Sequence, residues 1–328
     1  MRVLVEDVLF QIPASTPLLI TLFFHAIRDR HRVVADPNGP YRAWAARLDD
    51  DTRKFCDNAL DFSALAESLE PAVIELRVVA AGTPSWRPPR LPLVDALELL
   101  QRPYKILVED ARSDRAFLLA MCTPEQRQFF EDRERRGLLE FVHGGGVSSM
   151  NTVVEALAND DRAQLTTFVL FDSDALRPGV PSPQSEQLRA ACTPHIAHHQ
   201  LRRRFIESYL PLRALSDWAG SIRNSKKRKK RRHRFAALAR LTPAQRHFYN
   251  MKKGFLEDDK RAKAAQTAGA LYDGVDHFTR EALAHGLDAH LSALFHPPGA
   301  RFSERDLKDD GSWQEGSGLA ARLVELAR

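Results

Sequence analysis

Three short apolar runs between residues 106 and 171 are separated by helix-like segments, and this alternation constrains the fold more than any other feature. The runs are ILV at 106–108, LLEFV at 138–142 and TTFVLF at 166–171, and the first two lead through a turn into helix-forming sequence. Strands that alternate with helices predict a parallel, doubly wound sheet whose strands share one carboxyl edge. We therefore expect an α/β fold with a Rossmann-like parallel core.

Carboxylates follow the first and the third of these runs. Glu109 comes directly after the first, and Asp172 and Asp174 follow the third in FDSD. Side chains alternate along a strand, so the two aspartates are expected to point the same way from one strand tip. Oxygen donors at the carboxyl edge of such a sheet favour Mg²⁺ and phosphate chemistry. The alternative for the Asp-x-Asp pair alone is a solvated loop that caps the next helix.

The order of these motifs resembles the toprim domain, which has a glutamate after its first strand and Asp-x-Asp after its third. VEDARSDRAFL at 108–118, HGGGVSSM at 143–150 and RRRFIESYLP at 202–211 are also similar to motifs of OLD-type nucleases and of stand-alone toprim effectors in bacterial anti-phage systems such as PARIS. The resemblance covers residues 103–211. It implies a nuclease with Mg²⁺ or Mn²⁺ at Glu109, Asp172 and Asp174, and Asp114 and Glu207 as supporting acidic positions.

The same resemblance implies further catalytic and regulatory features. A lysine downstream of the acidic motifs is expected to neutralise developing charge, and Lys252 and Lys253 are the candidates, with an ordinary surface pair as the alternative. The chain lacks a G-x-x-x-x-G-K-[ST] motif, so we expect a separate ABC-type ATPase to restrain or activate it. A homodimer is the expected active form. Two other readings stay open: a housekeeping toprim enzyme such as an RNA-maturation nuclease, and a non-catalytic nucleic-acid-binding subunit.

Positive charge is concentrated although the net charge of 328 residues is only +5. Residues 226–235 read KKRKKRRHRF, and residues 202–204 are three arginines. Clustered bases are the footprint of a protein that binds the phosphate backbone of DNA or RNA. The expected nucleic-acid contacts are Arg202, Arg203, Arg204, Lys226, Lys227, Arg228, Lys229 and Lys230. A solvated loop is the alternative for 226–235, and a structural strand edge is the alternative for 202–204.

The chain divides by sequence character into three parts. Residues 1–100 are predicted to be an N-terminal α+β segment that offers a docking region, and WRPPRLP at 86–92 is the expected linker, because closely spaced prolines disfavour a helix. Residues 101–215 form the expected toprim catalytic core, and residues 216–328 are predicted to be mainly helical. Three isolated cysteines and the lack of a long apolar stretch predict a cytoplasmic protein without a membrane span.

Overall fold

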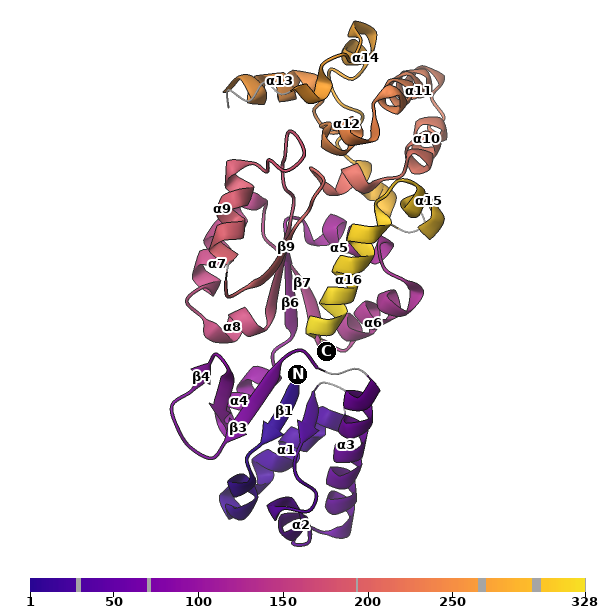
Figure 1. The fold of residues 1–328 in the computed structure, drawn as a ribbon. Coiled ribbons are helices and arrows are strands. Elements are labelled where there is room, and N and C mark those ends of the chain that lie inside the picture. Colours follow the sequence, from indigo (N-terminus) through magenta and orange to yellow (C-terminus); the bar gives the residue numbers. More distant parts are fainter. Residues whose placement is uncertain (28–30, 70–71, 193, 265–269, 297–301, 328) are drawn as a thin grey trace.

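The computed structural model describes residues 1–27, 31–69, 72–192, 194–264, 270–296 and 302–327. An N-terminal unit lies at one end of the molecule, a second sheet lies in the middle, and a helical region covers the other end (Figure 1). The central sheet is parallel, and the chain after it is helical. The predicted α/β class, with its Rossmann-like core and helical C-terminal part, is therefore confirmed.

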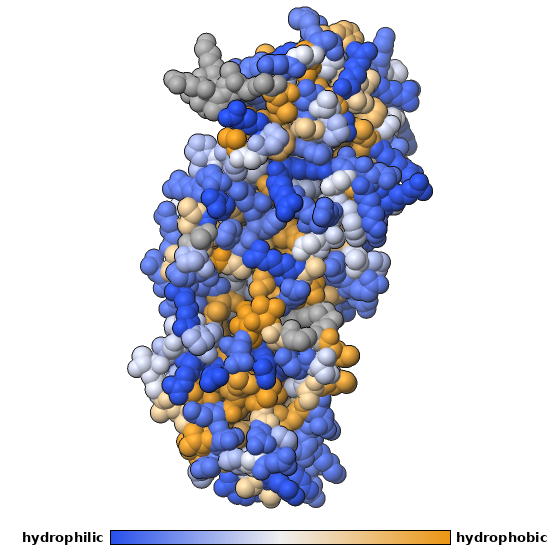
Figure 2. Space-filling view, viewed as in Figure 1, coloured by the Kyte–Doolittle hydropathy of each residue, from blue (hydrophilic) through white to orange (hydrophobic). Residues whose placement is uncertain are grey.

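The N-terminal unit is built on a mixed five-stranded sheet in the order β2-β1-β3-β5-β4, in which only the β4–β5 pair is antiparallel. Figure 2 shows patches of apolar surface over this unit, in the lower half of the view. The strands are β1 (Arg2–Val5), β2 (Arg32–Val34), β3 (Glu75–Val79), β4 (Ser85–Trp86) and β5 (Pro89–Pro92). The helices are α1 (Thr16–Ile27), α2 (Pro40–Ala45), α3 (Asp50–Leu69) and α4 (Leu93–Leu100).

Residues 86–92 are not the linker that their prolines predict. They complete β4 and supply β5, which pairs with β3 in parallel and with β4 in antiparallel orientation. Pro89 and Pro92 stand at the two ends of β5, where a missing backbone N–H is best tolerated. Leu91 between them is fully buried. Burial of this side chain therefore anchors the segment in the sheet, and the connection to the central sheet runs through α4 instead.

The central sheet is four-stranded and parallel, in the order β7-β6-β8-β9. One face is covered by α5, α6 and the C-terminal helix α16, and the other by α7, α8 and α9 (Figure 1). The strands are β6 (Tyr104–Val108), β7 (Leu139–His143), β8 (Thr167–Phe171) and β9 (Ala197–Gln200). The helices are α5 (Ala111–Ala120), α6 (Pro124–Arg135), α7 (Val147–Leu157), α8 (Asp161–Leu165), α9 (Pro183–Cys192) and α16 (Trp313–Ala327).

The chain winds from β6 outward to β7, and then returns past β6 to β8 and β9. The winding direction reverses between β6 and β8, so the carboxyl ends of these two strands flank a topological switch point. In doubly wound sheets this is where ligands bind. The helical region faces the same edge (Figure 1).

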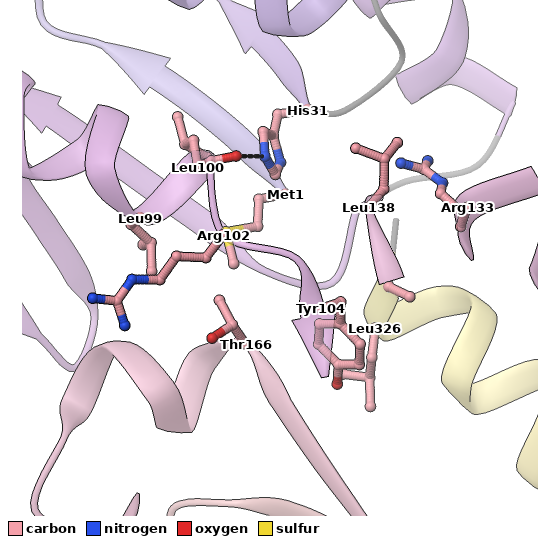
Figure 3. Close-up of a pocket in the computed structure, with 11 residues that line it drawn as sticks. Met1, His31, Leu99, Leu100, Arg102, Tyr104, Arg133, Leu138, Thr166 and Leu326 are labelled. Atoms are coloured by element: carbon pink, nitrogen blue, oxygen red, sulfur yellow. Dashed lines mark hydrogen bonds between the residues drawn. The ribbon is translucent and has the colours of Figure 1, made fainter. Parts of the chain in front are cut away.

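A small pocket lies at the opposite edge of the central sheet, against the N-terminal unit (Figure 3). Tyr104, Leu138 and Thr166 line it, and these residues stand at or just before the beginnings of β6, β7 and β8. Its volume is about 30 Å³, which is on the order of one water molecule. The pocket is therefore both too small and at the wrong end of the strands for catalysis in this fold.

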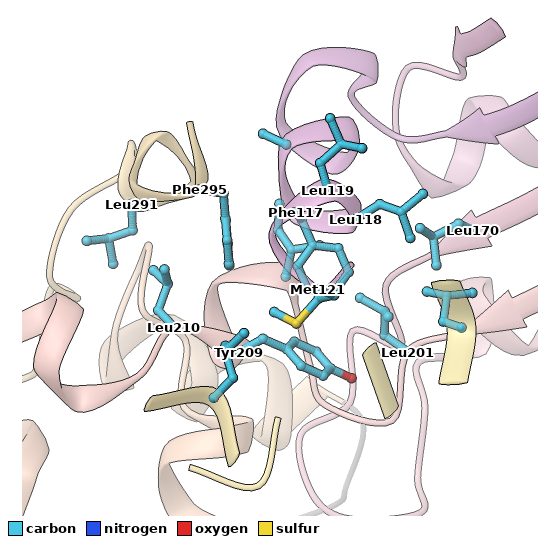
Figure 4. Close-up of a cluster of buried hydrophobic side chains, with 14 of the residues drawn as sticks. Phe117, Leu118, Leu119, Met121, Leu170, Leu201, Tyr209, Leu210, Leu291 and Phe295 are labelled. Atoms are coloured by element: carbon cyan, nitrogen blue, oxygen red, sulfur yellow. The ribbon is translucent and has the colours of Figure 1, made fainter. Parts of the chain in front are cut away.

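The helical region is tied to the central sheet by a shared apolar core. Figure 4 shows Phe117 and Leu118 of α5 next to Leu170 of β8, Tyr209 and Phe295. The rings of Phe117 and Phe295 meet edge to face with centroids 5.4 Å apart. The region comprises η3 (Ile206–Tyr209), α10 (Leu212–Ser221), α11 (Ser225–Arg240), α12 (Pro243–Phe248), α13 (Phe255–Ala264), η4 (Ala270–Tyr272), α14 (His277–Ala282), η5 (Leu291–Phe295) and α15 (Glu304–Asp309). None of the described helices is long and apolar enough to cross a membrane.

Candidate metal centre

The switch point places two acidic residues side by side. Glu109 follows β6 and Asp172 follows β8, and the Asp172 N–H donates to the Glu109 Oε1 at 3.0 Å. The hydrogen bond exists because β6 and β8 are paired neighbours whose carboxyl ends reach the same level. Two of the three residues predicted to form the metal centre are thus brought together by the sheet itself.

The η3 segment closes the centre from the helical side. The Ile206 N–H donates to Asp172 Oδ1 at 3.1 Å, and the neighbouring Glu207 side chain is almost fully buried. The Ser185 hydroxyl of α9 donates to the Asp172 carbonyl oxygen at 2.7 Å. The backbone and one carboxylate oxygen of Asp172 are therefore held from two elements, and Glu207 is brought to the same place, as predicted.

Asp114 and Asp174 reach the cluster from the two flanking loops. Asp114, in the first turn of α5, is buried and accepts the Asp110 N–H at 2.8 Å. Asp174 lies beyond the end of β8, with a left-handed φ of 51° and its N–H donating to the Arg204 carbonyl oxygen at 3.0 Å. The strand ends at Phe171, so the predicted alternation of Asp172 and Asp174 along it is wrong. Asp tolerates this backbone conformation better than most residues do.

One of the two candidate lysines belongs to the cluster. Lys252 Nζ lies 3.1 Å from Glu207 Oε1 and 5.3 Å from the centroid of the Phe205 ring. Lys253 is exposed, and its backbone N–H donates to Asn250 Oδ1. The loop after α12 therefore delivers Lys252 to the acidic groups, and Lys253 lies on the surface.

The carboxylates raise one another's pKa values. Burial, followed by the charges of Asp174 and Glu207, raises the pKa of Glu109 to about 7, against the opposing effects of the Asp172 N–H and Lys252. Burial and the charge of Glu109 raise the pKa of Asp114 to about 7 as well, although the Asp110 N–H opposes them. Burial and then the charge of Glu109 hold the pKa of Asp172 well above its usual range. The cluster carries more negative charge than its surroundings neutralise.

Lys252 compensates part of this charge. Burial acts to lower the pKa of its ammonium group, but the charges of Glu207 and Asp172 outweigh that effect and raise the pKa. A protonated lysine among several carboxylates is the electrostatically favoured arrangement.

The donor set suits a hard divalent cation such as Mg²⁺, because every side chain in it offers carboxylate oxygen. One of these atoms, Glu207 Oε2, is buried and has no hydrogen-bond partner among the described residues, which a cation would correct. In the described ranges, no three His, Cys, Asp or Glu side chains stand in the arrangement that holds a metal ion. Coordination would therefore require the side chains of Glu109 and Asp172 to turn from their present amide partners.

Two of the three adjacent arginines are structural, which corrects their prediction as phosphate ligands. Arg203 is buried and pairs with Asp310 at 2.6 Å. Arg204 is fully buried, pairs with Asp258 at 2.8 Å and donates to the Phe248 carbonyl oxygen. Both guanidinium groups are used to fix the helical region to the central sheet. Arg202 is exposed, so it alone of the three could contact a phosphate.

The second basic run forms the start of α11 and is not the loop that was the alternative. Asn224 caps this helix by accepting the Lys227 N–H at 3.0 Å. Four of the predicted contacts, Lys226, Lys227, Lys229 and Lys230, are exposed, and Arg228 is partly exposed. Further along, Arg231 pairs with Asp288 at 2.8 Å and stacks on Trp218. The first two turns therefore present free lysines, and the later turns anchor the helix.

The sequence prediction missed two side chains that build the centre. Ser185 orients the Asp172 backbone, and Phe205 lies under the Lys252 ammonium. Phe205 belongs to RRRFIESYLP, so its nearness to Glu207 in sequence was an available signal. Ser185 had none, because it reaches the centre only through the packing of α9.

Comparisons with known proteins leave the assignment to this geometry. The chain matches no protein-family model, no curated protein and no solved structure.

Proposed function

We propose that this chain is a Mg²⁺-dependent endonuclease, with Mn²⁺ as an alternative cation, which hydrolyses phosphodiester bonds of nucleic acid through a toprim-like centre. The observation that carries the proposal is the pairing of Glu109 with Asp172 at the switch point, with Glu207 and Lys252 beside them. A cluster of carboxylates at this edge, accompanied by a single lysine, suits a reaction in which negative charge develops on phosphate oxygens.

Glu109, Asp172 and Asp174 would hold the cation, with Asp114 and Glu207 as supporting acidic positions. A bound divalent cation would polarise the phosphate and lower the pKa of a coordinated water. The unpartnered Glu207 Oε2 and the crowding of carboxylates support this role.

The side chains around the cation would orient the reactants and move the proton. Glu109 is the candidate general base, since it lies at the end of β6 beside Asp172 and would accept the proton of the attacking water. Lys252 would stabilise the charge that develops on the phosphate oxygens. Glu207 and the Phe205 ring hold the Lys252 ammonium in place.

A nucleic-acid substrate is supported by the exposed lysines at the start of α11. This helix belongs to the region that faces the carboxyl edge of the sheet (Figure 1). Bases there would attract a polyanion that the acidic centre alone would repel. Arg202 is the one arginine of its run that remains available for the same purpose.

The biological role we propose is that of a toxic effector in a bacterial anti-phage system, restrained or activated by a separate ATPase and active as a homodimer. It rests on the resemblance of three motifs to OLD-type and PARIS effectors. The housekeeping nuclease and the non-catalytic binding subunit are the alternatives that the following experiment addresses.

The test is cleavage of plasmid DNA, single-stranded DNA and total tRNA with Mg²⁺, with Mn²⁺ or with EDTA. We expect the wild-type protein to cut at least one substrate with metal present, and Glu109→Gln and Asp172→Asn to lose cutting. Asp217→Asn changes an exposed carboxylate of α10 and serves as the control. Binding without cleavage under every condition would identify the non-catalytic subunit. Cutting by folded Asp172→Asn at the wild-type rate would refute the metal centre.

A further inference from the structure

Exposed apolar side chains are concentrated in the N-terminal unit. Of the twelve large apolar side chains that are exposed in the described part of the chain, seven precede residue 74. Phe24 and Ile27 belong to α1, and Phe62, Leu65 and Leu69 belong to α3, where their exposed fractions are 42%, 60% and 73%. These helices pack against each other. Their exposed side chains make one continuous feature, and such features commonly mark protein-binding surfaces.

The apolar residues of α3 follow a regular spacing. Phe55, Phe62, Leu65 and Leu69 are separated by seven, three and four residues, with Asn58 as the polar residue between the first two. We call these four apolar residues the α3 stripe. It is distinct from the face that α3 already buries in the unit, which consists of Cys56, Ala59 and Ser63. One helix thus has two apolar faces, and only one of them is covered.

The neighbouring helix widens the α3 stripe. The Phe24 ring lies 6.3 Å from the Phe55 ring, centroid to centroid. The exposed side of α1 therefore forms one border of the stripe. On a helical wheel the opposite border is formed by Asp50, Asp57 and Asp61, which are all exposed and outnumber the single base there, Lys54.

The spacing and the charges together define what fits this surface. Apolar residues that recur at intervals of three and four are the seam of a helix pair, so the matching ligand is a second helix. Three aspartates along one border favour a ligand with lysine or arginine beside its own seam.

We propose that the α3 stripe is the docking site for an amphipathic helix of a partner protein, with basic residues flanking its apolar seam. The inference concerns only the partner named in the proposed function. The surface lies on the N-terminal unit, away from the acidic centre, so loss of docking and loss of cleavage are separate outcomes.

The test uses two synthetic helical peptides with the same leucine seam, one flanked by lysines and the other by glutamates, each carrying a fluorescent label. Anisotropy titrations are made with the full chain and with the double variant Phe62→Ser, Leu65→Ser. Phe278→Ser, which removes an exposed aromatic side chain from α14, is the matched control. Circular dichroism and thermal unfolding establish that each variant is folded.

We expect the lysine-flanked peptide to bind about tenfold or more tightly than the glutamate-flanked one at low salt. The double variant should lose this binding, and Phe278→Ser should retain it. Equal binding of both peptides, or binding that survives in the folded double variant, would overturn the proposal. So would light scattering that showed the wild type to be a dimer and the double variant a monomer, because the stripe would then be covered by a second copy of the chain.

Discussion

The crowding of carboxylates at the switch point predicts that removing one of them stabilises the metal-free protein. Asp114 is the best probe, because it is buried and its Oδ2 accepts only a backbone N–H in the structure described here, that of Asp110. In Asp114→Asn the amide oxygen retains this hydrogen bond, and the negative charge is lost. The substitution therefore isolates the electrostatic cost of the cluster from its packing.

The size and the pH dependence of the effect follow from the raised pKa of Asp114, which burial and Glu109 shift from 3.8 to about 7. The folded protein binds this proton more tightly than the unfolded chain does, so the group costs nothing below pH 4. The cost grows as the pH rises through this interval and is complete above about pH 7. The difference in pKa corresponds to a full cost of about 4 kcal/mol.

The assay is urea unfolding of wild type and Asp114→Asn in EDTA between pH 4 and pH 8.5. The variant should match the wild type at pH 4 and become more stable by roughly 2–4 kcal/mol at pH 8. Glu140→Gln, which changes an exposed carboxylate paired with Lys105, is the control and should stay within about 0.5 kcal/mol. A stability difference between Asp114→Asn and wild type that did not change with pH would refute the electrostatic reasoning.

Three further predictions test other parts of the assignment. Asp258→Ala leaves the buried guanidinium of Arg204 without its counter-ion and should cost about 3–5 kcal/mol in urea unfolding; a loss below 1 kcal/mol would contradict this structural role. Lys252→Met should lower the single-turnover rate of metal-dependent cleavage by about 100-fold or more, whereas an unchanged rate would remove Lys252 from the proposed mechanism. Gly144→Ala places a Cβ against Met150 and 2.9 Å from the Val108 carbonyl oxygen, so thermal unfolding should show a loss of about 1–3 kcal/mol, and an unchanged melting temperature would contradict the close packing.

The central sheet could be predicted because its signals are local. Each strand is a short apolar run bounded by turn residues, and the alternation with helices determines that the strands are parallel. The meeting of Glu109 with Asp172 follows from that topology alone, although 63 residues separate them. The relative position of Asp174 could not be predicted in the same way. Its placement depends on where β8 ends, and strand ends are set by hydrogen bonds that sequence periodicity does not reveal.

The arginines were misassigned for a related reason. A run of three arginines has the same composition whether it faces solvent or the interior, and only partners distant in sequence decide between the two. Asp258 and Asp310, which pair with Arg204 and Arg203, lie more than fifty residues downstream. The prolines of residues 86–92 misled in the same way, since the burial of Leu91 against β3 and its neighbours outweighs local preference.

The segment RRRFIESYLP therefore has a different physical role from the one its charge indicates. Its Ile206 N–H binds Asp172, its Glu207 holds Lys252, and its Arg203 and Arg204 anchor it to helices that follow. Any change that loosens these anchors should displace the Asp172 and Lys252 contacts together, since both run through one short stretch of backbone. Affinity for a polyanion must then come from elsewhere, and the exposed lysines that begin α11 are the largest predicted source that remains. Substituting them should weaken nucleic-acid binding and its salt dependence while leaving the acidic centre intact.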